Sequence, residues 1–90
     1  MFTIPRVNVI ESDEGFSVEV LGQTGVQYAE SGKNLFIDSE VLAGPAGMII
    51  YSNSIKNWED GSTVDEVEQT RIVDNVKRAF RHRGLEIQVA

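Results

Sequence analysis

The segment between residues 63 and 89 constrains the fold more than any other part of the sequence. Apolar residues recur in it at helical spacing and fall mostly on one face, at Val67, Ile72, Val73, Val76, Ala79 and Phe80. Thr63 and Glu66 have the spacing of a capping box, which predicts that the helix begins there. Gly84 supplies a residue suited to a left-handed helix end. We therefore expect one long helix that ends at Gly84.

Strand patterns lie on both sides of this helix. Residues 47–51, Gly-Met-Ile-Ile-Tyr, form an apolar run typical of a central strand that is buried on both faces. After the helix, Leu85, Ile87 and Val89 alternate with polar residues, which predicts a final strand with one buried face. A right-handed crossover through the helix would place this final strand parallel to the strand at Met48.

The first part of the chain predicts two hairpins and then a loop. Apolar residues alternate with polar ones on both sides of the turn at 13–15, namely Val7, Val9, Phe16, Val18 and Val20. A second pair of strands, 26–30 and 34–38, is joined by Ser-Gly-Lys and has Tyr28, Leu35 and Ile37 as core residues. Residues 39–46 contain Gly-Pro and predict a loop. The expected fold is α+β: a mostly antiparallel sheet of about five or six strands with one long C-terminal helix packed on one face, followed by a final strand.

Length and composition limit the classes of function. A chain of 90 residues suits a single domain, 1–90. The chain has no Cys, which excludes disulfides, thiolate metal sites and thiol catalysis. Its formal net charge of −6 argues against nucleic acid as a ligand. No secretory leader pattern and no apolar run of about 20 residues is present, so we expect a cytoplasmic protein that does not contact the membrane.

The cations of the expected helix allow two interpretations. They could form a basic ridge, or they could simply complement the negative end of the helix dipole, as the acids at its start complement the positive end. The residues concerned are Arg71, Lys77, Arg78, Arg81 and Arg83.

No catalytic constellation is evident. His82 is the only His, and it lies between two Arg residues without an adjacent carboxylate. Ser52 and Ser54 would need a base that nothing in the sequence brings to them. The carboxylate pairs at 59–60 and 65–66 lack the spacing of a calcium loop, and the glycines form no phosphate-binding pattern. We therefore expect no enzyme, no metal and no cofactor.

The segment from Tyr51 to Trp58, Tyr-Ser-Asn-Ser-Ile-Lys-Asn-Trp, contains the only Trp. Its two rings could pack in the core together with Ile55. Alternatively, one or both rings could be partly exposed anchors surrounded by polar residues, the usual composition of an interface hot spot. Both interpretations can hold, one for each ring.

The same segment carries a family resemblance. Its most specific part is Tyr51-x-x-Ser54-Ile55-Lys56-x-Trp58, and the likeness continues through Arg-Ile-Val-Asp-Asn-Val in the helix to Arg-Gly-Leu-Glu-Ile near the end. This half of the chain resembles the bacterial immunity protein 74 family of polymorphic toxin systems. The resemblance implies a single-domain antidote that binds and neutralises a cognate toxin domain.

The leading hypothesis is therefore a toxin-neutralising protein that acts by surface occlusion. Tyr51 and Trp58 would be aromatic anchors within a candidate partner-binding set of Tyr51, Ser54, Lys56, Trp58, Glu59, Asp60 and Glu66. The acidic members would form a rim that speeds association with a basic toxin. A second hypothesis is a structural or adaptor module without a toxin partner, dimerising through an exposed sheet edge. An enzyme is a third, and it requires His82 or a carboxylate pair in a cleft.

Overall fold

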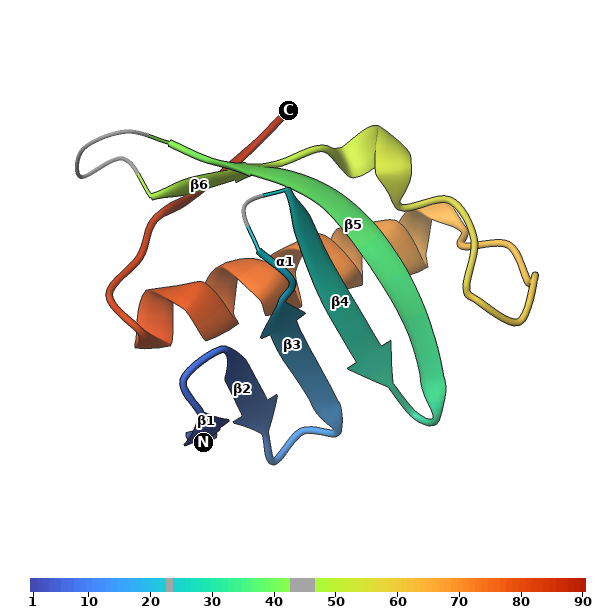
Figure 1. The fold of residues 1–90 in the computed structure, drawn as a ribbon. Coiled ribbons are helices and arrows are strands. Elements are labelled where there is room, and N and C mark those ends of the chain that lie inside the picture. Colours follow the sequence, from blue (N-terminus) through green and yellow to red (C-terminus); the bar gives the residue numbers. More distant parts are fainter. Residues whose placement is uncertain (23, 43–46) are drawn as a thin grey trace.

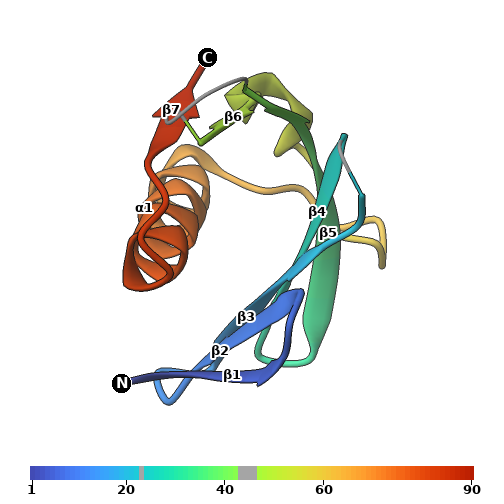
Figure 2. The ribbon, with the colours of Figure 1, turned by 60° about the vertical axis from the view of Figure 1, so that its left-hand side comes forward.

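A computed structural model describes residues 1–22, 24–42 and 47–90. In these residues the strands form one sheet in chain order, and this sheet curls around one α-helix (Figures 1 and 2). Along the chain the elements are β1 (Phe2–Arg6), β2 (Val9–Ser12), β3 (Phe16–Val20), β4 (Gly25–Glu30), β5 (Lys33–Val41), β6 (Met48–Ile50), the 3-10 turn η2 (Ser52–Ser54), α1 (Glu66–His82) and β7 (Ile87–Val89).

Within the residues that the structure describes, the sheet is mixed and has seven strands. Neighbours from β1 to β6 pair antiparallel, whereas β6 and β7 pair parallel with Met48 opposite Ile87. This confirms the α+β class, the single long helix followed by a final strand, and the parallel pairing. The expectation of a mostly antiparallel sheet with five or six strands was wrong. Strand β1 was not predicted; it contains Pro5 and is mostly exposed, as suits an edge strand.

Both predicted hairpins are confirmed, with differences at their ends. Val18 lies opposite Tyr28 and Tyr28 opposite Leu35, so these residues form a buried row across the sheet. Val7 is not in a strand: it lies in the β1–β2 turn and is 81% exposed. The predicted loop at 39–46 begins as strand, because β5 continues to Val41 by pairing with β6. The rest of that prediction, including Gly-Pro at 44–45, lies outside the described residues.

The helix begins two residues later than predicted. The Asp65 carboxylate accepts a hydrogen bond from the Glu68 amide at 2.7 Å, and the Glu68 carboxylate accepts one from the Asp65 amide at 3.2 Å. Thr63 instead pairs with Asn57 in an isolated bridge, which keeps this part of the chain extended. The predicted end is confirmed, since Gly84 follows the helix with a φ of +81°.

The core lies between the concave face of the sheet and α1. From the helix it contains Ile72, Val76, Ala79 and Phe80. Val67 is 76% exposed because it lies about 140° around the helix from Ile72, so its predicted place on the apolar face was wrong. The final strand begins at Ile87, so Leu85, which was predicted to belong to it, precedes it. Ile87 is buried, whereas Leu85 and Val89 are exposed.

The central strand is also less buried than expected. Met48 and Ile50 are buried in β6, but Ile49 on the other face is only half-buried, because α1 covers one side of the curled sheet (Figure 2). No helix in the described parts of the chain is both long and apolar enough to cross a membrane.

Candidate functional site

The segment from Tyr51 to Glu59 runs along the edge of β5 that β6 leaves free. The Tyr51 amide donates to the Asp38 carbonyl at 2.9 Å, and the Glu59 amide donates to the Asn34 carbonyl at 2.8 Å. Between them, the Ser54 hydroxyl accepts a hydrogen bond from the Asp38 amide at 2.9 Å. The segment thus satisfies strand groups that would otherwise form an exposed edge. It also fixes most of the predicted partner-binding residues beside β5.

Trp58 belongs to the core. Its side chain is 3% exposed, its ring centroid lies 6.3 Å from that of Tyr28, and Lys33 Nζ lies 5.6 Å from the ring centroid. Ile55, three residues earlier, is also buried. Because the indole fills the space beneath the segment, it is not presented at the surface as the aromatic-anchor interpretation required. For Trp58 the core interpretation is therefore the one that the structure bears out.

Tyr51, in contrast, is only half-buried. Its hydroxyl donates to the Glu40 carboxylate at 3.1 Å, and this hydrogen bond raises the pKa of Tyr51 above its usual value. The Ser54 hydroxyl donates to the Tyr51 carbonyl at 2.6 Å and so closes the 3-10 turn. Ser54 therefore positions the segment, whereas the Tyr51 ring lies at its surface.

The polar residues that follow are exposed. Glu59 accepts a hydrogen bond from the Gln27 amide, so its carboxylate reaches across β5 to β4. Asp60 accepts from the Ser62 hydroxyl at 2.6 Å, and this contact lowers the pKa of Asp60. Lys56 is exposed beside them. All three side chains are exposed to solvent, although Glu59 and Asp60 also make these contacts within the chain.

Glu66 lies on the helix and not on the 51–60 segment. It lies in the first turn of α1 and lines a shallow hollow with Val67, Thr70, Arg71 and Asp74 on the solvent side of the helix. The sequence placed Glu66 close to Glu59 along the chain. The extended segment at 63–64 and the later start of the helix separate the two.

The arrangement of α1 and η2 does not bring a serine to the histidine. His82 packs on Phe2 with ring centroids 5.4 Å apart, near the end of α1. Ser52 lies near the start of α1, where its carbonyl accepts from Gln69 at 2.8 Å. Residues 69 and 82 are about 20 Å apart along a helix of ordinary rise. In the described residues, no group of three or more His, Asp or Glu side chains is arranged to hold a metal ion.

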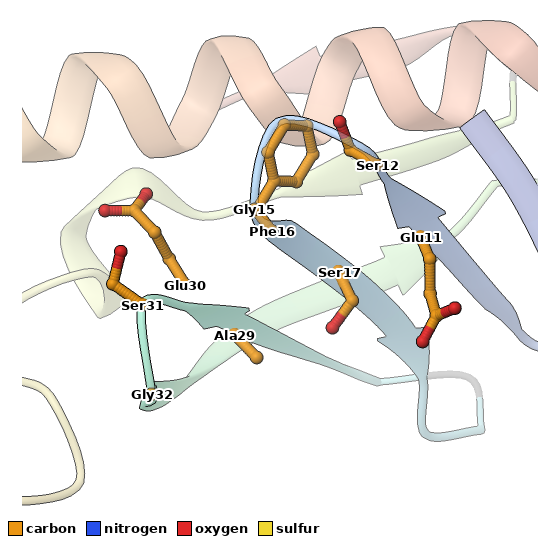
Figure 3. Close-up of a pocket in the computed structure, with 9 residues that line it drawn as sticks. All are labelled: Glu11, Ser12, Gly15, Phe16, Ser17, Ala29, Glu30, Ser31 and Gly32. Carbon is orange, nitrogen blue, oxygen red and sulfur yellow. The ribbon is translucent and has the colours of Figure 1, made fainter. Parts of the chain in front are cut away.

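A hollow lies between the β2–β3 turn and the β4–β5 turn (Figure 3). Figure 3 shows Glu11, Ser17 and Ala29 pointing away from the helix, whereas the Phe16 ring lies on the helix side. Glu30, also at this hollow, is held by Arg71 at 2.6 Å. The two carboxylates of the hollow thus lie on different faces of the sheet.

The helix cations tie the helix to the sheet. Arg71 makes a paired contact with Glu30, and Arg78 makes one with Glu14 at 2.9 and 3.2 Å. Arg83 donates to the Val7 carbonyl at 2.6 Å. Neither a free basic ridge nor the helix dipole describes these contacts. No pattern in the sequence indicates which acceptor each arginine binds.

The comparisons with known proteins gave one finding. The family model for Immunity protein 74 matches residues 17–90, from β3 through β7. Comparison with curated proteins and with solved structures returned no match. The matched region includes the whole 51–60 segment and the helix.

Proposed function

The chain belongs to the immunity protein 74 family, and from this premise we propose that it binds a cognate toxin domain in the cytoplasm and neutralises it by occluding a surface, without catalysis. The observation that carries the proposal is the family match over residues 17–90. A small rigid domain suits this role, since inhibition by occlusion needs only a complementary, preorganised surface.

We assign the contact to the half-buried Tyr51 and to exposed polar members of the 51–60 segment. Tyr51 would supply an aromatic contact, and Lys56, Glu59 and Asp60 would supply polar ones. Hydrogen bonds from the segment to β5 and the buried Trp58 hold the backbone of the segment in place, so little backbone freedom would be lost on binding. Ser54 and Trp58 then act by positioning the segment.

Co-expression tests this proposal directly. The C-terminal domain of the protein encoded immediately upstream would be produced in a bacterial host with and without this chain. We expect growth arrest that the chain relieves, together with co-elution of the two proteins. A harmless neighbouring domain, or toxicity that the chain does not relieve, would contradict the proposal.

A homodimeric adaptor is the second candidate function. Strand β1 has only one neighbour in the sheet, and its residue Ile4 is 43% exposed, so its free edge could pair with a second copy. Light scattering over a range of protein concentrations separates the candidates. A concentration-dependent dimer that persists in the presence of the upstream domain would favour the adaptor.

A further inference from the structure

The side of the sheet that faces away from α1, here called the outer face, carries uncompensated negative charge. Because side chains alternate along a strand, every second residue of each strand points to this side. On β2 to β5 the charged residues of this set are Glu11, Glu19, Asp38 and Glu40. None of them forms a salt bridge with another described residue. The carboxylates of Glu14 and Glu30, in contrast, are paired with helix arginines.

An exposed aromatic ring also lies on this acidic face. Phe36 occupies a position in β5 whose strand neighbours on the same side are Asn34 and Asp38, yet it is apolar and 46% exposed. Its ring covers Gly25 on β4, where any side chain would collide with the ring. The absence of a side chain at Gly25 thus lets the ring lie flat across two strands. Such a supported aromatic ring loses little freedom when a partner covers it.

The outer face joins the 51–60 segment into one surface. Phe36 lies directly opposite Gln27, whose amide bonds the Glu59 carboxylate across β5. Further along the same strand, Glu40 accepts the hydroxyl hydrogen bond of Tyr51. Two members of the proposed contact segment, Tyr51 and Glu59, are therefore held against the outer face by direct side-chain contacts.

We propose that the toxin docks on this outer face, with Phe36 at the centre of the interface, and that the toxin surface is cationic with an apolar recess for the ring. The inference rests on the proposed function and extends it to a surface and a partner chemistry. An apolar aromatic centre within a polar rim is the usual composition of a hot spot. The carboxylates would also steer a basic partner toward the face. A cation, Arg6 on edge strand β1, lies at the margin of the same side.

Two variants of the outer face test the proposal in binding kinetics with the immobilised upstream C-terminal domain. Phe36→Ala should weaken the equilibrium affinity by about 30-fold or more, as expected for a hot-spot aromatic. Asp38→Asn combined with Glu40→Gln keeps shape and removes charge. It should lower the association rate constant by about threefold or more and flatten its salt dependence.

Matched controls lie on the solvent side of α1. Val67→Ala removes an exposed apolar side chain, and Glu66→Gln removes an exposed carboxylate. Both should bind within about twofold of the wild-type chain. Circular dichroism and thermal melting establish that each variant is folded. Should Phe36→Ala fail to fold, the Asp38→Asn and Glu40→Gln pair decides the outcome, since both substitutions leave the ring and its support unchanged.

The outcomes separate this inference from the proposed function. If the folded outer-face variants bind as well as the wild type, or if the helix variants lose binding instead, the outer-face assignment is overturned. Either result leaves the toxin-binding role intact. A wild-type chain that neither binds nor relieves toxicity would overturn the proposed function, and the inference with it. Loss of binding confined to the outer-face variants supports both.

Discussion

Asn75 Nδ2 donates a hydrogen bond of 2.9 Å to the hydroxyl of Tyr28, and this contact joins the buried side of α1 to the centre of the sheet. Asn75 is a buried polar side chain, and its carbonyl oxygen accepts from Arg78 at 2.6 Å. The Tyr28 hydroxyl in turn donates to Glu30 at 2.6 Å, and Glu30 binds Arg71. A continuous polar network therefore crosses the contact between helix and sheet. Its members are interdependent, because each buried group depends on its neighbour for a partner.

Replacement of Asn75 by Ala should destabilise the fold. The change removes two hydrogen bonds and leaves a small cavity, for which we expect a loss of about 1–3 kcal/mol in the free energy of unfolding. Urea denaturation measures this loss. Thr70→Ala, at an exposed position of the same helix, is the control and should change stability by less than about 0.5 kcal/mol. Equal effects of the two substitutions would show that the network contributes no stability.

Alkaline titration should report the burial of Tyr28. Burial and then its hydrogen bond to Glu30 raise the pKa of Tyr28, and the Glu40 contact raises the pKa of Tyr51. Above pH about 10 the unfolded chain binds fewer protons at these groups than the folded chain, so stability falls as pH rises. In Tyr51→Phe, the absorbance of tyrosinate should appear only with loss of the circular dichroism signal. A Tyr28 that ionises near pH 10 in the folded protein would contradict this.

How much of this arrangement could be predicted from sequence depends on whether a local pattern has one interpretation. The hairpins were predictable because burial of one face imposes strict alternation around Tyr28 and Leu35. The helix start was ambiguous, since Thr63 with Glu66 and Asp65 with Glu68 are overlapping capping patterns. A tertiary contact, the bridge between Asn57 and Thr63, decides between them.

The candidate surface shows the same limit. The exposure of Phe36 could have been predicted, because this apolar residue occupies a position between Asn34 and Asp38 where strand alternation calls for a polar one. For Trp58 the sequence left both interpretations open. Whether an indole on a loop faces solvent depends on which parts of the fold lie next to it. Here these are Tyr28 and Lys33 of the β4–β5 hairpin.

Two glycines with similar backbone angles should respond differently to Ala. Gly84 and Gly47 have φ of +81° and +83°. A Cβ at Gly84 meets no atom within 4 Å, so Gly84→Ala should cost about 1–2 kcal/mol from backbone strain alone. At Gly47 a Cβ would also collide with the backbone carbonyl of Glu86, beside the β6–β7 pair. Urea denaturation should therefore show a loss for Gly47→Ala at least about 1 kcal/mol larger. Equal losses of stability for the two substitutions would mean that the Glu86 carbonyl lies further from Gly47 than in this structure.

Trp58 should behave as a buried residue that positions the contact segment. As the only Trp, it should give blue-shifted emission that is shielded from acrylamide and moves to longer wavelength on unfolding. Trp58→Ala should lower the free energy of unfolding by about 3–5 kcal/mol, whereas Lys56→Ala, at an exposed position, should change it by less than about 0.5 kcal/mol. Trp58→Phe retains most of the packing, so its folded form should bind the toxin domain as the wild type does. A stable Trp58→Phe protein with strongly weakened binding would instead mean that the indole itself contacts the toxin, through a rearrangement of the segment along β5.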